Sequence, residues 1–301
     1  MQHTFKRGLF DRYDGWRIRN VDALFNVIPF ILRSRLDSQN MFEESIPLEP
    51  LERFVRRLRE EMPEVSYMHV FIAALVRIIA LRPYLNRFIV WNKVYARNNI
   101  TLSLAIKRSM TDKGEETVVK IEFEPTDTIQ DVARRISEAV NSNKVEGAVN
   151  TADKISRFMG YIPAFVMRFV IWVIRSLDNI GHLPRFMFDA SPWHASMFLT
   201  NMGSLGIGPI YHHLYEFGTC SIFMAMGNKT RIHTVSETGE REIRRFIGLK
   251  INIDERICDG LYFATSIKQF RHILAKPDVL LTPPETVNVD DGVGKPRIDG
   301  K

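Results

Sequence analysis

Cysteine is scarce in this chain, and the scarcity narrows the possible classes of protein. Only Cys220 and Cys258 occur among 301 residues, so neither a disulfide framework nor a cysteine-rich zinc site can be built. No positively charged and apolar leader stands at the start of the sequence. We therefore expect a protein of a reducing compartment, taken to be the cytoplasm, that folds without disulfides and without a metal.

Other signatures are missing as well. The glycines between 203 and 208 are spaced Gly-x-x-Gly-x-Gly, which is not a dinucleotide-binding fingerprint. The net charge is +6, but the arginines are scattered and form no dense basic and aromatic stripe, so we expect no nucleic-acid partner. A modest excess of positive charge could still favour a phosphorylated ligand.

Periodic hydrophobic patterns predict alternating helices and strands. Helices are predicted over 21–33, 47–61, 67–81, 128–142 and 261–274, and strands over 32–46, 89–97, 101–107, 116–123, 220–226 and 249–255, with a charged hairpin over 228–244. We expect the strands at 89–97 and 101–107 to pair with each other. Residues 1–283 are predicted to form a single domain, and 284–301 a flexible tail because large apolar residues are almost absent there.

An unusually apolar segment interrupts this order at about 150–188. Pro163, Arg168 and Arg175 break it, so it is too short to cross a membrane. The two arginines share one helix face and leave the rest of the circumference apolar. For the helix at about 158–177 we expect burial in the core or in a subunit interface, with a membrane surface as the less favoured alternative.

Charged side chains gather where the last predicted strand ends. Residues 249–254 alternate, and Glu255, Arg256 and Asp259 follow directly, before Gly260 and a helix. Strand ends are where a rigid scaffold usually presents reactive groups. The segment resembles the signature of the chloramphenicol acetyltransferase and dihydrolipoyl acyltransferase superfamily, in which a histidine stands four residues before the aspartate of an Asp-Gly pair. Here Cys258-Asp259-Gly260 fits that signature, and Glu255 takes the position of the histidine.

Two other blocks carry the same resemblance. The string Arg82-Pro-Tyr-Leu-Asn86 is similar to the junction between a long helix and a strand in dihydrolipoyl acyltransferases. Residues 198–206, Phe-Leu-Thr-Asn-Met-Gly-Ser-Leu-Gly, resemble the strand and loop that carry the family's oxyanion-binding serine. Thr200 matches that serine and keeps the hydroxyl, and Ser196 is a weaker candidate.

The resemblance implies a fold, an assembly and a set of roles. It implies an α/β (α+β) two-layer sandwich like that of chloramphenicol acetyltransferase, with a mixed sheet flanked by helices, assembled as a homotrimer or as a higher cage of trimers. Acyl-CoA would be a substrate and not a tightly bound cofactor, and the acceptor would be a small molecule or a lipoyl domain supplied in trans. Thr200 would stabilise the oxyanion, and Asp259 would hold the active-site loop through an N-terminal arginine, Arg17 or Arg19.

The glutamate leaves the activity open. A carboxylate with an ordinary pKa near 4.3 is about two units less basic than imidazole. Glu255 could still act as the base of an acyltransferase, or the chain could be a non-catalytic relative that serves as an oligomeric scaffold or acyl-CoA-binding protein. A membrane-peripheral protein is a third possibility. His212 and His213 stand without acidic or cysteine ligands at metal-binding spacing, and Cys258 lacks an identifiable base.

Overall fold

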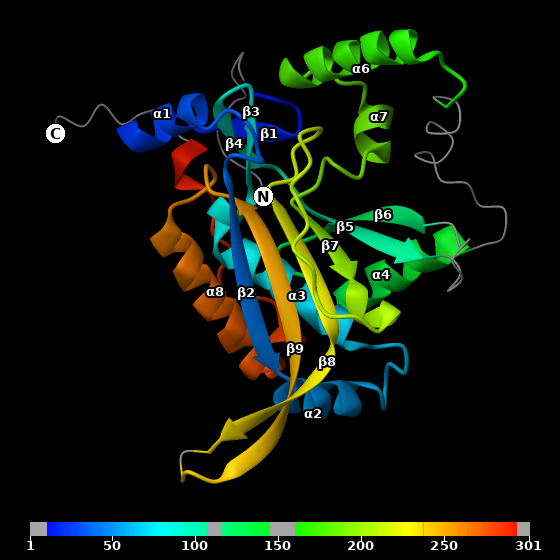
Figure 1. Cartoon of the computed structure of the whole chain (residues 1–301), viewed down its shortest axis with the longest axis vertical. Helices are drawn as coiled ribbons and strands as arrows, with labels where there is room; N and C mark the ends of the chain where they lie inside the picture. Colours follow the sequence, from blue (N-terminus) through cyan, green and yellow to red (C-terminus); the bar gives the residue numbers. More distant parts are fainter. Residues whose placement is uncertain (1–10, 108–115, 145–159, 237, 294–301) are drawn as a thin grey trace.

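A six-stranded mixed sheet forms the centre of the computed structural model, which describes residues 11–107, 116–144, 160–236 and 238–293 (Figure 1). The strand order is β2-β9-β8-β7-β5-β6. The neighbours of β7 run parallel to it, and the other pairs are antiparallel. The strands are β2 Gln39–Pro47, β5 Ile100–Lys107, β6 Glu116–Phe123, β7 Met197–Asn201, β8 Ile222–Val235 and β9 Arg241–Asp254.

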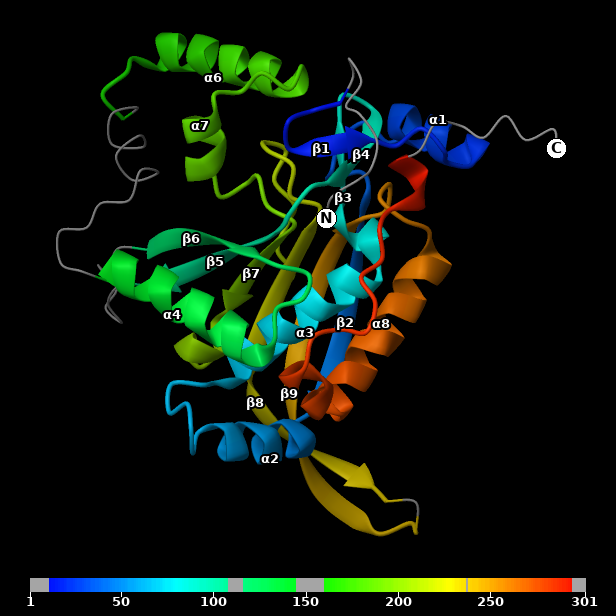
Figure 2. The same cartoon turned by 180° about the vertical axis from the view of Figure 1, so that it is seen from behind.

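Helices cover one face of this sheet (Figure 2). They are α2 Glu49–Leu58, α3 Tyr67–Leu81, α4 Ile129–Lys144 and α8 Gly260–Ala275. The central helix, α3, has the bounds predicted from the sequence. It begins where the Ser66 amide donates to the His69 ring at 3.0 Å, and it ends before Pro83, which cannot continue a helix. The predicted two-layer α/β architecture is confirmed.

A second, three-stranded sheet corrects one predicted pairing. Its strands are β1 Gly15–Arg17, β3 Arg87–Val90 and β4 Lys93–Arg97, in the order β1-β4-β3. The single strand predicted over 89–97 is therefore a hairpin, turned by Trp91 and Asn92 at φ 49° and 59°. Strand β5 pairs with β6 and β7, so the expected pairing of 89–97 with 101–107 is wrong.

The first helix and the charged hairpin agree better with prediction. Helix α1, Ala23–Ile31, carries Pro29 in its last turn, and the following strand begins only at Gln39. Beyond a bulge between Met226 and Lys229, strands β8 and β9 leave the sheet as a long arm (Figure 1). Most side chains of the arm are exposed, as expected for the charged hairpin predicted over 228–244.

The apolar segment folds as two helices at the edge of the molecule. Helix α6 spans Ala164–Asn179 and α7 spans Arg185–Ala190, and Figure 1 shows α6 standing apart from the central sheet. Ile174 and Asp178 are buried, but Phe165, Phe169 and Trp172 are more than half exposed. The expected burial of this surface in the core of the chain is therefore wrong for the aromatic side chains. Residues 150–159 lie outside the described part.

The segment after α8 is packed and not free. We expected a flexible tail over 284–301, but residues 284–293 run back along the body of the protein. Asp290 is 3% exposed and forms an ion pair with buried Arg87, and the Asn288 amide donates to the Ala80 carbonyl. A buried ion pair fixes this stretch in spite of its polar composition. Residues 294–301 lie outside the described part.

Candidate active site

Glu255 stands immediately after strand β9, at an edge of the central sheet. Its amide donates to the Ser38 carbonyl at 2.8 Å, which continues the pairing of β9 with β2 by one residue. Asn40 of β2 donates through Nδ2 to the Glu255 Oε2 at 2.8 Å. The side chain of Glu255 is half-buried. One of its carboxylate oxygens is held by a neutral donor from the neighbouring strand.

Arg256 does not neutralise Glu255. Its Nε and Nη2 donate to the two carboxylate oxygens of Asp254 at 2.8 and 2.7 Å, and its Nη1 donates to the Leu32 carbonyl at 2.9 Å. Both partners of this bidentate pair are buried. Because Arg256 is engaged with Asp254, it fixes the strand end, and no ion pair within the described residues joins Glu255 to a cation.

Asp259 caps a helix and does not meet the predicted arginines. Its Oδ1 accepts a hydrogen bond from the Tyr262 amide at 2.8 Å, which starts helix α8 at Gly260. Arg19 instead pairs with Asp11 at 2.9 Å, and the Arg17 amide donates to the same carboxylate. Within the described residues no bond joins Arg17 or Arg19 to Asp259.

Arg87 of β3 lies between Asp290 and the loop before Asp259. Its Nε and Nη2 bind Asp290 at 2.6 and 2.7 Å, while Nη1 lies 3.5 Å from the Ile257 carbonyl. Burial raises the pKa of Cys258, the next residue, to about 12. The thiol is therefore protonated at neutral pH, and a nucleophilic role for Cys258 is not supported.

Thr200 lies on β7, with its hydroxyl directed toward the Met202 sulfur at 3.8 Å. Its side chain is half-buried, and within the described residues the hydroxyl has only this weak sulfur acceptor. Ser196, the weaker candidate, is buried, and its Oγ accepts a hydrogen bond from the Thr101 amide at 3.0 Å. Ser196 is thus a structural link between strands, and Thr200 remains the candidate donor.

Glu255 and Thr200 lie at opposite ends of the sheet. Thr200 pairs with Ala225, and Ala225 pairs with Lys250. Glu255 follows Lys250 along the chain, and the strand and sheet spacings place the Cα atoms of Glu255 and Thr200 roughly 19 Å apart. The chain therefore does not bring the two side chains together within one copy.

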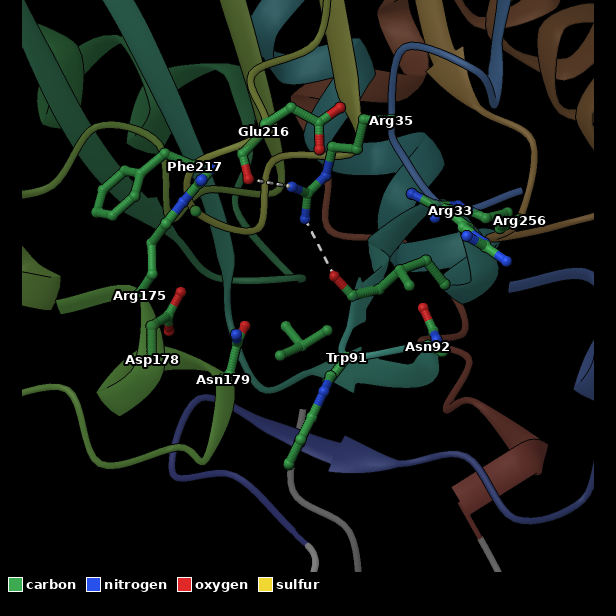
Figure 3. A pocket seen from close by; sticks show the side chains of 13 residues that line it. Arg33, Arg35, Trp91, Asn92, Arg175, Asp178, Asn179, Glu216, Phe217 and Arg256 are labelled. Atoms are coloured by element: carbon green, nitrogen blue, oxygen red, sulfur yellow. Dashed lines mark hydrogen bonds between the residues drawn. The ribbon is translucent and has the colours of Figure 1, made fainter. Parts of the chain in front are cut away.

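A cavity of about 290 Å³ adjoins the Glu255 strand end (Figure 3). Four arginines line it, Arg33, Arg35, Arg175 and Arg256. Arg35 is buried and donates to the Ile89 and Glu216 carbonyls, whereas Arg33 and Arg175 are exposed. Two acidic residues also line the cavity: Asp178 is paired with Arg12 and His194, and the Glu216 carboxylate accepts from the Leu36 amide. With four arginines against these two carboxylates, the lining has an excess of positive charge, which suits an anionic ligand. Sequence reasoning missed this pocket because its residues come from distant segments.

Three histidines, His194, His212 and His213, lie outside the Glu255 strand end. His212 and His213 stack at 4.8 Å between ring centroids, and the described residues contain no cluster of three metal-ligating side chains. His194 is fully buried, with Nδ1 2.6 Å from the Ser191 hydroxyl and Nε2 3.1 Å from Asp178. Arg12 also binds Asp178, so this network fastens the end of α6. In the sequence, the three-residue spacing of Ser191 and His194 was the one available sign of this hydrogen-bond network.

Comparison with known proteins identifies the fold. No family model matches the sequence, and no curated protein matches it. A probable dihydrolipoamide acetyltransferase from Listeria monocytogenes has a TM-score of 0.56 at 15% identity, covering 85% of this chain and 93% of that one.

Two further structures give the same result. Dihydrolipoamide acetyltransferase from Azotobacter vinelandii, studied for the roles of a serine, a histidine and an asparagine in catalysis, has a TM-score of 0.57 at 13% identity, covering 88% of this chain and 94% of that one. The cubic core of the pyruvate dehydrogenase multienzyme complex gives 0.55 at 13% identity, covering 88% and 94%. The chain has the fold of the dihydrolipoamide acetyltransferase catalytic domain.

Proposed function

We propose that this protein transfers an acyl group from coenzyme A to a thiol or hydroxyl acceptor, with a carboxylate base in place of imidazole. The observation that carries the proposal is the position of Glu255 at the strand end, four residues before Asp259 and directed by Asn40. In the Azotobacter vinelandii enzyme the catalytic histidine and asparagine have this same spacing. The acceptor would be a small molecule or a lipoyl domain provided in trans.

The proposed chemistry assigns one step to each side chain. Glu255 takes the proton from the acceptor, and the resulting thiolate or alkoxide attacks the carbonyl carbon of the acyl-CoA thioester. Thr200 donates a hydrogen bond to the oxyanion that forms. When the intermediate collapses, the bond to sulfur breaks and the coenzyme A thiolate recovers the proton from Glu255.

Such a site requires two copies of the chain. Because Glu255 and Thr200 lie roughly 19 Å apart in one copy, a complete site would combine Glu255 of one subunit with Thr200 of the next. A homotrimer closes this arrangement with three equivalent sites, and a larger cage could be built from such trimers. The structural similarity to a cubic core of a multienzyme complex supports an assembly of this kind.

The arginine-lined cavity is the proposed site for the phosphates of coenzyme A. Arg33 and Arg175 present exposed guanidinium groups, and phosphate groups are ligands that arginine binds with two donors at once. Trp91, 65% exposed at the rim, offers an aromatic face for the adenine ring.

Acyl-CoA-dependent thiol release, measured with a panel of acceptors, tests this function. Glu255→Gln keeps the shape and removes the base, so we expect turnover to fall by about 10²–10⁴-fold. Glu43→Gln, at an exposed glutamate on the neighbouring strand β2, is the matched control and should leave turnover unchanged.

The replacement Glu255→His distinguishes a working acyltransferase from a non-catalytic relative. If the wild-type chain turns over acyl-CoA and loses activity in Glu255→Gln, the carboxylate is the base. A silent wild type together with an active Glu255→His variant would overturn the enzyme proposal and indicate a non-catalytic scaffold or acyl-CoA-binding protein that retained the pocket.

A further inference from the structure

Helix α6 presents a stripe of aromatic side chains to solvent. Phe165, Phe169 and Trp172 are 76, 63 and 63% exposed. Their spacing of four and three residues places them on one face of the helix, and the rings of Phe169 and Trp172 stack at 5.9 Å. Tyr161, just before the helix, is 89% exposed. An aromatic surface of this size on the outside of a protein marks a contact site.

The charges around the stripe have one sign. Arg168 and Arg175 are exposed and flank the aromatic face on one side. Asp178 is the only acidic residue between 160 and 188, and it is buried against Arg12 and His194. The exposed part of the helix therefore carries positive charge and no negative charge, which complements an anionic surface.

The anchoring of α6 keeps the stripe on the outside. Asp178, in the last turn, binds Arg12 at 2.7 Å and His194 at 3.1 Å, and both partners are buried. The helix is thus fastened by a charged network at its C-terminal end. Its aromatic face points away from that network, because Ile174 and Asp178 occupy the opposite, buried side.

We propose that α6 lies flat on an anionic phospholipid membrane. Phe165, Phe169 and Trp172 would enter the boundary between headgroups and acyl chains, while Arg168, which does not line the arginine-lined cavity, binds a lipid phosphate. With 16 residues the helix is about 24 Å long, and no helix in the described ranges is long and apolar enough to cross a membrane. The helix therefore binds in the plane of the surface.

The first helix lies at the same end of the molecule and would extend the contact. Leu24, Val27 and Ile31 of α1 are 64, 51 and 67% exposed. Figures 1 and 2 both show α1 and α6 at the end opposite the β8–β9 arm. A second copy of this chain is the competing occupant, and the oligomeric state of the α6 variants distinguishes it from a membrane.

Vesicle cosedimentation of the full chain tests the proposal. We expect binding to vesicles of equimolar phosphatidylcholine and phosphatidylglycerol, and weak binding to phosphatidylcholine alone. Phe165→Ser and Trp172→Ser should each lower the partition coefficient about tenfold. Val235→Ser and Ile243→Ser, at exposed apolar positions of the opposite arm, are matched controls that should leave binding unchanged.

A charge variant with its own control separates specific binding from the general basic character of the chain. Arg168→Gln should weaken binding about fivefold, whereas Arg231→Gln on the arm should not. Free inorganic phosphate should not compete, because the aromatic side chains supply much of the affinity.

Three outcomes would overturn the proposal. They are absence of binding by the wild type, equal losses in the α6 and arm variants, and a change of oligomeric state in Phe165→Ser or Trp172→Ser, which would show that the stripe joins copies of the chain. Acyl transfer to a water-soluble acceptor should persist in these variants, so failure of membrane binding is distinguishable from failure of the proposed activity.

Discussion

Single buried ion pairs fix the segments around Glu255. The side chains of Arg87 and Asp290 are 5 and 2% exposed, so Asp290→Asn would leave a buried guanidinium without its counter-charge. We expect the free energy of unfolding to fall by about 3–5 kcal/mol, measured by urea denaturation. A loss below about 1 kcal/mol would mean that residues 284–293 contribute little to the fold.

A second ion pair provides the control for that measurement. Arg57 and Asp278 also join the C-terminal part to the body, but their side chains are 56 and 64% exposed. Asp278→Asn should therefore cost no more than about 1 kcal/mol, because water solvates both groups in either state.

His194 gives the protein a predictable response to acid. Burial lowers the pKa of His194, in spite of its bond to Asp178, so the folded protein holds the ring neutral. An unfolded histidine gains a proton as the pH falls below about 6.5, and stability is lost from there down to the folded pKa. We expect unfolding free energy to decrease between pH 7 and pH 5, and His194→Gln to flatten this dependence.

Two other titratable groups, His69 and Asp178, also contribute to the pH dependence of stability. Burial also lowers the pKa of His69, so a residual slope should remain in His194→Gln and disappear when His69 is replaced as well. Asp178 titrates in a more acidic range than the two histidines. Burial opposes its ionisation, but His194 and Arg12 lower its pKa to about 2. Its contribution is present above about pH 4 and is lost as the pH falls toward 2. An unchanged slope in the double variant would contradict the assignment.

Residue types were easier to predict than residue partners. The resemblance implied that Arg17 or Arg19 would pair with Asp259, whereas Arg87 approaches this loop instead, with Nη1 3.5 Å from the Ile257 carbonyl. Arg87 is the first residue of β3, so its position depends on the β3–β4 hairpin that the sequence did not reveal. Likewise, nothing in the polar stretch around Asp290 reveals that it is buried, because its partner lies about 200 residues away.

The β3–β4 hairpin stores strain at the rim of the arginine-lined cavity. Trp91 adopts φ 49°, a left-handed conformation that disfavours a bulky side chain and accommodates glycine. We expect Trp91→Gly to raise the free energy of unfolding by about 1 kcal/mol. The same variant should weaken acyl-CoA binding about tenfold, because it removes the proposed stacking surface for adenine.

Asn92→Gly is the control for this hairpin. Asn92 adopts φ 59°, which asparagine tolerates, so glycine there should change stability little. Calorimetric titration with acyl-CoA and thermal unfolding measure the two effects separately. Unchanged affinity in Trp91→Gly would remove Trp91 from the proposed site.

Elements were predictable where local signals agreed. For α3, the apolar run, the Ser66 start and Pro83 all indicate the same bounds, and the structure has them. The 89–97 stretch failed because Trp91 is a strand-forming residue, and its left-handed turn leaves no mark in the hydrophobic pattern. The Asn92 that follows was the one available signal for a tight turn.

At the scale of the whole molecule, the fold could be predicted from the sequence. What covers the apolar surface of α6 could not. Hydrophobic periodicity and the blocks around Asp259 and Thr200 were enough to indicate the two-layer architecture. The pattern of α6 showed that its surface is apolar, but a pattern does not say whether core, subunit or membrane covers it. Because the Trp172 side chain is exposed, the core of the same chain does not cover this surface of α6.

The proposed division of the site between copies leads to a complementation experiment. Glu255→Gln lacks the base and Thr200→Val lacks the oxyanion donor, so each variant alone should be inactive. In mixed assemblies, a subunit with intact Glu255 can face a neighbour with intact Thr200. In a random mixture of equal amounts, the chance that the subunit supplying position 255 has Glu255 is one half, and the chance that its neighbour has Thr200 is also one half. About one quarter of the shared sites are therefore complete.

Activity of the mixture, measured as thiol release after co-expression, distinguishes shared from self-contained sites. A site within one chain would stay inactive at every mixing ratio, since no copy holds both groups. Thr200→Ser keeps the hydroxyl and should retain most of its activity without mixing, so it controls for damage to β7. Recovery near one quarter would place Glu255 and Thr200 across a subunit boundary, as their separation at opposite ends of the sheet requires.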